Sequence, residues 1–253
     1  MRRSKLVEQI YQSGHNLNMN EPDYFIRVMN HLDSKYTNDL GSRGDVTTNC
    51  IIDPIANATA AIIAKENGIL CGMEEVEEFY IRHGLNITIN AKDGDNISKG
   101  QKIIELTGKS QRLLKTERTA LNLLQMMSGI ATNTKEYCDA LRAYDTKVAA
   151  TRKDWCDELI EKKGVYIGGG LTHRLRLDGF IMIKDNHLKA LENQGITYPI
   201  VSAIKKAYNC PHSYAIEIEV KDENEALLAA QIFRTNGGLN GPKIPIIMLD
   251  NIE

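Results

Sequence analysis

The chain has 253 residues, of which 42% are hydrophobic and 25% are charged. This ordinary globular composition excludes a disordered chain, and no apolar run approaches the roughly 18–20 residues that a membrane span requires. The 31 Lys and Arg against 33 Asp and Glu give a formal net charge of −2, which argues against a dedicated nucleic-acid binder. The amino terminus has no apolar segment typical of a secretory signal, so we expect a cytoplasmic protein.

The length predicts one large domain or two modest ones. The five cysteines are widely spaced and odd in number, which predicts neither a disulfide framework nor a zinc site. We therefore expect reduced thiols, as in a cytoplasmic protein.

The first half of the chain predicts a small domain of mixed helix and strand. Helical spacing of apolar residues predicts helices over residues 6–11, 22–32, 74–84 and 110–127, the last ending at Gly129. Short apolar or alternating runs predict strands over 58–65, 68–71, 85–90 and 101–106. Residues 36–45, rich in Asn, Gly and Asp, predict a loop.

The second half has a different rhythm. Short β-branched runs predict strands over 147–151, 180–184, 214–220 and 244–249, and helical patterns cover 198–208 and 224–234. Alternating strands and helices indicate βα units with a parallel sheet or barrel.

Each of these four runs ends in polar or charged side chains. They are Thr151-Arg152-Lys153, Lys184-Asp185-Asn186-His187, Glu217 with Glu219, and Asp250-Asn251. Active sites of α/β barrels and open α/β sheets lie at the carboxyl ends of parallel strands. The alternative is that strand ends are polar simply because loops are, but four charged ends favour a functional site.

The charges of this half are also sorted by sign. Residues 147–190 hold nine Lys and Arg against six Asp and Glu, whereas residues 191–253 hold five against eight. Arginine binds carboxylate or phosphate through two parallel hydrogen bonds, and carboxylates such as Glu219 and Asp250 are natural Mg²⁺ ligands. The pattern predicts a polyanionic substrate that arrives with Mg²⁺. Gly168-Gly169-Gly170 allows either close approach of a ligand to the backbone or simply a flexible turn.

Nine short segments, in order, resemble the quinolinate phosphoribosyltransferases, also called carboxylating nicotinate-nucleotide pyrophosphorylases. The segments are GDVTT (44–48), IAKENG (63–68), ERTALN (117–122), SGIAT (128–132), TRK (151–153), GGG with THRL (168–175), IKDNH (183–187), EIEV (217–220) and LDN (249–251).

The resemblance implies an α/β fold with two domains. Residues 1–128 would form an N-terminal α/β sandwich that includes the long linking helix, and residues 129–253 would form an open α/β barrel. Family members continue past the LDN segment with further βα units and glycine-rich loops, so we expect the barrel to be incomplete here. The resemblance also implies a homodimer in which each active site is completed by the partner's N-terminal domain.

The resemblance implies a role for each matching residue. Arg118 would be contributed across the dimer interface, and Thr151 would contact substrate. Four residues would hold the two carboxylates of quinolinate: Arg152, His173, Arg174 and Lys184. Lys153 would lie between the dicarboxylate and the phosphoribosyl donor. Glu219 and Asp250 would be catalytic acids near the ribose and ligands of a Mg²⁺ cofactor.

The implied reaction joins quinolinate to phosphoribosyl pyrophosphate and releases CO₂ and pyrophosphate, giving nicotinate mononucleotide for NAD biosynthesis. Neither nucleic acid nor membrane would be a partner. Two alternatives stay open: a related molybdenum-associated homologue, which segment 183–187 disfavours, and a truncated or non-catalytic paralogue that only binds anions or dimerises. The second is favoured by the acidic stretch Asp154–Glu158, which replaces the family's usual Pro-Gly or Trp-Gly pattern.

Overall fold

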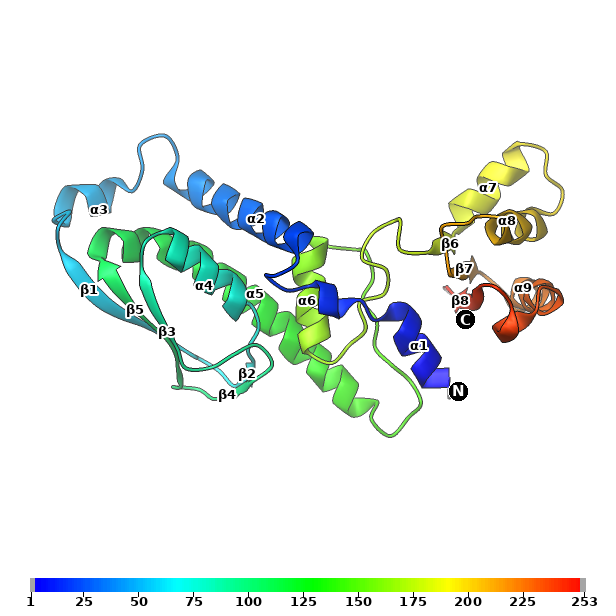
Figure 1. Cartoon of the computed structure of the whole chain (residues 1–253), viewed down its shortest axis with the longest axis horizontal. Coiled ribbons are helices and arrows are strands. Elements are labelled where there is room, and N and C mark those ends of the chain that lie inside the picture. The colour runs from blue at the N-terminus through cyan, green and yellow to red at the C-terminus, as the bar shows by residue number, and fades with distance from the viewer. Residues whose placement is uncertain (1–2, 251–253) are drawn as a thin grey trace. The chain divides into compact units, whose positions relative to one another are not determined.

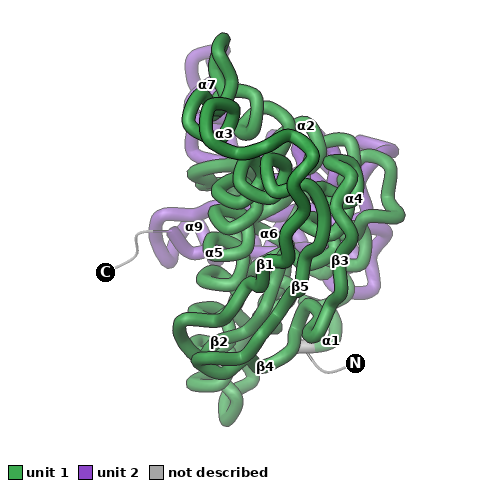
Figure 2. Tube along the Cα trace, turned by 90° about the vertical axis from the view of Figure 1, so that its left-hand side faces the viewer, with its two compact units in different colours: residues 1–175 green, residues 176–253 purple. Residues whose placement is uncertain are grey.

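The computed structural model describes residues 3–250 and divides the chain into two compact units, residues 1–175 and 176–253 (Figures 1 and 2). The expected boundary after residue 128 falls inside a helix of the first unit, α5 (Ser110–Ala140). Within the described residues, no helix is both long and apolar enough to cross a bilayer. All five cysteines lie in this part of the chain and are free thiols.

The first unit is built on an antiparallel sheet with the strand order β1 (Asn57–Ile63), β5 (Lys102–Lys109) and β3 (Asn86–Ile89). Two shorter strands, β2 (Gly68–Ile69) and β4 (Asn96–Ile97), pair separately. β2 lies where a strand is expected, whereas the sequence did not predict β4. β5 runs past its expected end because β1 pairs with it as far as Asn57 opposite Lys109.

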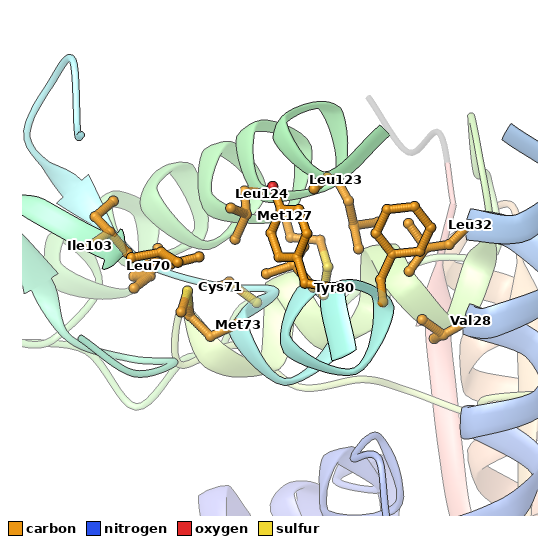
Figure 3. Close-up of a cluster of buried hydrophobic side chains, with 14 of the residues drawn as sticks. Val28, Leu32, Leu70, Cys71, Met73, Tyr80, Ile103, Leu123, Leu124 and Met127 are labelled. Carbon is orange, nitrogen blue, oxygen red and sulfur yellow. The ribbon is translucent and has the colours of Figure 1, made fainter. Parts of the chain in front are cut away.

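Helices cover one side of this sheet. α4 (Met73–Arg82) and α5 contact the strands, and α2 (Pro22–Leu40) packs against both helices (Figure 1). The core between the layers is continuous and is formed by the buried side chains of Val28, Leu32, Leu70, Tyr80, Ile103, Leu123, Leu124 and Met127 (Figure 3). The expected α/β sandwich is confirmed.

Two helices are longer than their sequence patterns predict. α2 continues to Leu40, because Tyr36 packs edge-on against the rings of Phe79 and His83 on α4. The predicted loop is therefore wrong before Gly41. α5 passes through Gly129 to Ala140, since its later turns bury Ala131 and Thr134. Packing of this kind outweighs the helix cost of one glycine.

The expected strand over 147–151 is wrong. Only one parallel bridge forms there, between Ala149 and Leu171. The next element is a helix that the pattern did not predict, α6 (Glu158–Ile167), which packs along α5. The amino-terminal α1 (Arg3–Tyr11), the short helix η1 (Gly14–Asn16) and α3 (Val46–Ile51) complete the unit.

The glycines after α6 allow this helix to approach α5. A Cβ atom on Gly168 would lie 2.4 Å from the carbonyl oxygen of Ala131 and 2.6 Å from the Cβ of Thr134. Gly170 is equally crowded by Val165 and Thr134. Close helix packing, and not a flexible turn, therefore explains both residues.

This crowding predicts opposite effects for two glycine substitutions. Gly168→Ala should lower the free energy of unfolding by about 1–3 kcal/mol, because the added methyl overpacks the α5–α6 contact. Gly129→Ala, at an exposed position of α5 with no atom near the added methyl, should raise stability by about 1 kcal/mol. Urea unfolding of both variants tests this, and equal stabilities would contradict it.

A buried ion cluster joins α6 to α4. Lys163 Nζ lies 2.6 Å from Glu75 Oε1, 2.9 Å from Glu74 Oε2 and 3.2 Å from Asp93 Oδ2. The Tyr24 hydroxyl donates to Glu75 Oε1 at 2.7 Å. Burial lowers the pKa of Lys163. The surrounding carboxylates, Glu75 first, raise this pKa by more, so the pKa is raised on balance and the lysine is charged.

The second unit is a parallel sheet with the strand order β6 (Ile181–Ile183), β7 (Ala215–Val220) and β8 (Ile244–Leu249). The connections hold α7 (Asp185–Asn193), α8 (Pro199–Tyr208), α9 (Glu223–Thr235) and η2 (Gly238–Asn240). The expected βα rhythm is confirmed, with α7 as an additional helix. The three described strands form no closed barrel.

The two faces of β7 differ in polarity. Ile216, Ile218 and Val220 belong to the core that the helices cover. Because side chains alternate along a strand, Glu217 and Glu219 lie on the opposite face. An open barrel would have this face inside, which is consistent with the expected fold.

Candidate active site

The first group of candidate residues lies in the first unit, after the Ala149 bridge. Thr151, Arg152 and Lys153 form an exposed segment without regular secondary structure. The Thr151 hydroxyl accepts a hydrogen bond from the Lys153 N–H at 3.2 Å, which closes a local turn. Two cations are therefore presented to solvent from a short loop.

Arg152 is held by a residue that the sequence marked as a departure from the family. Its Nε donates to both oxygens of Glu158, at 3.0 and 3.3 Å. Glu158 also pairs with Lys162 Nζ at 3.2 Å, and Lys162 is 2% exposed. Lys162 Nζ in turn donates to the backbone carbonyl of Arg174. This chain of contacts links Arg152 to the segment that carries His173 and Arg174.

His173 and Arg174 are almost fully buried, at 8% and 7% exposed. His173 has a φ of +53°, a conformation that side chains other than glycine rarely adopt. The Tyr11 ring packs edge-on against its imidazole, with ring centres 4.6 Å apart. Backbone strain of this kind is concentrated at functional sites, where the surrounding structure maintains it.

The amino-terminal segment provides that support. Thr172 Oγ1 accepts from the Ser13 N–H and donates to the Tyr11 carbonyl, both at 2.9 Å. Gln12 donates to the Gly170 carbonyl at 3.3 Å. The sequence did not predict these contacts, because no residue pattern links positions about 160 apart in the chain.

Two acidic residues of the stretch that follows Lys153 form helix-capping hydrogen bonds or ion pairs with other residues of the chain. Asp157 caps α6 by accepting from the backbone of Leu159 and Ile160, and it pairs with Arg27 at 2.7 Å. Together with the Glu158 contacts, this means that both carboxylates are engaged by named partners. The negative charge of this stretch, which favours the non-catalytic alternative, is therefore partly neutralised by Arg27, Arg152 and Lys162.

Arg118 projects from the exposed side of α5. It lines a cavity of about 460 Å³ together with Lys35, His31 and Cys156. Burial, and then the charge of Lys35, lower the pKa of His31, so its ring is neutral near pH 7. The Cys156 Sγ lies 3.4 Å from His31 Nε2, and burial raises the pKa of this thiol, which keeps it protonated. The charged residues that line this cavity are therefore the cations Lys35 and Arg118 and the acidic Asp39, and the cysteine is not a thiolate.

The second group lies at the carboxyl edge of the parallel sheet. Lys184 follows β6, Glu219 is near the end of β7, and Asp250 follows β8. Lys184 Nζ lies 3.5 Å from Glu219 Oε2, and Asp250 is close enough to Glu219 to raise the pKa of its carboxyl group. The structure brings these three predicted residues together.

The environment of Glu219 raises the pKa of its carboxyl group. Burial is the main cause of its raised pKa, Asp250 raises it further, and Lys184 opposes the shift. The carboxyl pair lines a cavity of about 490 Å³, to which α7 contributes Asn186 and Lys189. The His187 Nδ1 accepts from the Lys184 N–H at 2.9 Å and so fixes the start of α7. The sequence matched His187 to the family without giving it this role.

The carboxyl groups of Glu219 and Asp250 suit a magnesium ion that takes only one or two of its ligands from the protein. No group of three or more His, Cys, Asp or Glu that could hold a metal occurs among the described residues. Mg²⁺ commonly uses one or two carboxylates and completes its shell with water and substrate phosphates. Two adjacent carboxyl groups lining a cavity meet that requirement.

Fold and charge together define an α/β protein that presents cations and an acidic pair to anionic ligands. Comparison with known proteins makes this more specific. The family models described as the N-terminal and C-terminal domains of quinolinate phosphoribosyl transferase match residues 45–128 and 130–253. The chain belongs to the quinolinate phosphoribosyltransferase family.

Individual relatives of the chain have names that belong to the same family. A probable carboxylating nicotinate-nucleotide pyrophosphorylase of Methanothermobacter thermautotrophicus is 36% identical over 213 residues, covering 83% of this chain and 71% of the relative. A Bacillus subtilis protein of the same description is 37% identical over 207 residues, covering 78% and 69%. The solved nicotinate-nucleotide pyrophosphorylase of Francisella tularensis superposes with a TM-score of 0.76 at 30% identity, covering 89% of this chain and 75% of the other.

Proposed function

We propose that the chain is a carboxylating nicotinate-nucleotide pyrophosphorylase, a pentosyltransferase that makes nicotinate mononucleotide from quinolinate and phosphoribosyl pyrophosphate. The observation that carries the proposal is the convergence of Lys184, Glu219 and Asp250 at one sheet edge. The relatives' names and the family match supply the reaction.

The proposed chemistry has two steps. The pyridine nitrogen of quinolinate forms a bond to C1 of the ribose, while the bond to the pyrophosphate oxygen breaks and its electron pair leaves with pyrophosphate. The ring then loses the carboxylate beside the nitrogen as CO₂, and the electron pair left on that carbon takes a proton from solvent. The positive ring nitrogen stabilises this carbanion.

The residues act mainly by electrostatics and positioning. We assign Arg152, His173, Arg174 and Lys184 to the carboxylates of quinolinate, with Thr151 as a further substrate contact. Lys153 would stabilise charge that develops at the phosphoribosyl donor. Glu219 and Asp250 would contact the ribose and hold Mg²⁺, which would neutralise the pyrophosphate leaving group.

Product identification tests this proposal. The purified chain would be incubated with quinolinate, phosphoribosyl pyrophosphate and Mg²⁺, and the products analysed by mass spectrometry. We expect nicotinate mononucleotide, no product when nicotinate replaces quinolinate, and loss of product on chelation that added Mg²⁺ reverses. Folded protein that makes no nicotinate mononucleotide would contradict the proposal.

We further propose a cytoplasmic homodimer in which Arg118 serves the partner's site. Its exposure on α5, beside the cation Lys35, supports this role. Arg118→Ala and Arg174→Ala should each be nearly inactive alone. Because a symmetric mixed dimer would contain one intact site, mixing the two variants should restore about a quarter of wild-type activity. An inactive mixture, with subunit exchange shown by mass labelling, would contradict the shared site.

A further inference from the structure

The segment that carries Arg152 and Lys153 lacks regular structure, yet its course is fixed by specific contacts. Residues 151–155 are exposed, and the side chain of Trp155 is 99% exposed. A loop of this kind gains little from burial, so its order must come from hydrogen bonds. The question is which groups supply them.

Glu161, in the first turn of α6, supplies two of these hydrogen bonds. Its Oε1 accepts from the backbone N–H of Trp155 at 2.8 Å and of Cys156 at 2.7 Å. Both bonds go to a carboxylate oxygen, and such charge-assisted bonds are about twice as strong as neutral ones. The backbone of the loop is thereby fastened to a helix that is itself packed against α5.

Glu158 supplies the matching contact to a side chain. It lies three residues before Glu161, a spacing that places both on one face of the helix. Its carboxylate holds Arg152 Nε and is anchored by the buried Lys162. The two glutamates therefore hold the loop at both ends, one through the backbone and one through the Arg152 side chain.

We propose that Glu161 is a positioning residue for Arg152 and Lys153, an inference that rests on the proposed function. Fixing the loop before substrate arrives removes an entropic cost that quinolinate binding would otherwise bear. If substrate binding had to order a single loop residue, the entropic cost would lower the affinity about tenfold. Glu161 itself contacts no substrate.

A role limited to supporting the fold makes a different prediction. It would lower stability and leave the loop and the substrate affinity of the folded protein unchanged. Trp155 can distinguish the positioning role from the purely structural role. It is the only tryptophan in the chain, and its backbone N–H is bound by Glu161. Its fluorescence anisotropy reports the mobility of this loop directly, with or without substrate.

The experiment compares three variants of the full chain. Glu161→Ala should lower Trp155 anisotropy and raise both the Kd and the KM for quinolinate about tenfold, with a smaller fall in kcat because Lys153 is also less well positioned. Glu161→Gln should lose much less than Glu161→Ala, because its amide oxygen still accepts both bonds, although without the charge of a carboxylate. Glu136→Ala removes an exposed glutamate from α5 and should behave as wild type.

Three outcomes would overturn the proposal. They are unchanged anisotropy and affinity in Glu161→Ala, an equal loss in Glu161→Gln, or a fall in kcat without a change in KM. If Glu161→Ala does not fold, Glu161→Asp carries the test, since its shorter side chain reaches the loop less well and should lower anisotropy in part. A wild-type chain that fails to bind quinolinate would contradict the proposed function, whereas the anisotropy comparison judges Glu161 independently.

Discussion

Replacing Arg174 with alanine should weaken quinolinate binding by about 100-fold. The side chain is almost fully buried, and a charge-assisted hydrogen bond contributes about 1.5–3 kcal/mol, roughly 10- to 150-fold in affinity. The fork geometry of arginine matches a carboxylate, so Arg174→Lys should retain only part of the affinity. Isothermal titration with quinolinate measures each loss.

Folding must be measured beside binding, because Arg174 lies in the strained segment after His173. We expect the melting temperature of the alanine variant to change far less than its affinity. Wild-type affinity in Arg174→Ala would refute the assignment of this residue to the dicarboxylate. A matched loss in an Arg142→Ala control, at a largely exposed site on the turn after α5, would show that the loss reflects general charge alone.

Lys163→Met should be the most damaging single substitution for stability. It removes the only cation in contact with Glu75, which is completely buried, among the contacts found in residues 3–250. Leaving one member of a buried pair without its partner typically costs about 3–5 kcal/mol. Urea unfolding followed by circular dichroism measures the change in the free energy of unfolding.

A second substitution tests whether the uncompensated carboxylate is the cause. Lys163→Met with Glu75→Leu should recover much of the lost stability, because replacing both members of a buried pair by apolar residues is often neutral. Asp93 and Glu74 would remain, so recovery should be partial. A double variant as unstable as Lys163→Met alone would show that lost packing, and not the buried charge, dominates.

The sequence predicted the elements whose buried faces are apolar. β7 and β8 are runs of β-branched residues with no competing pattern, and both lie where they were expected. α6 was missed because its buried face includes Lys162 and Lys163, which a hydrophobicity pattern assigns to solvent. Only the positions of Glu75 and Glu158 in the folded chain explain why these lysines are buried.

The residues of the candidate site likewise fall into a group that the sequence could predict and a group that it could not. The carboxyl ends of parallel strands meet at one edge, so Lys184, Glu219 and Asp250 could be grouped from strand order alone. The supports of the other group could not be predicted in this way. Glu161 acts on backbone N–H groups, which almost every residue type has, and the contact of Tyr11 with the strained His173 joins positions about 160 apart in the chain, which no spacing pattern links.

Decarboxylation of quinolinate by this chain should be coupled to phosphoribosyl transfer. Quinolinate labelled in the carboxylate beside the ring nitrogen would be incubated with the purified chain and Mg²⁺, with and without phosphoribosyl pyrophosphate. Labelled CO₂, pyrophosphate and nicotinate mononucleotide should appear in equal amounts, and only when the donor is present. Folded protein that releases no labelled CO₂ with both substrates, or releases it without the donor, would contradict the assignment of this chain as a carboxylating nicotinate-nucleotide pyrophosphorylase.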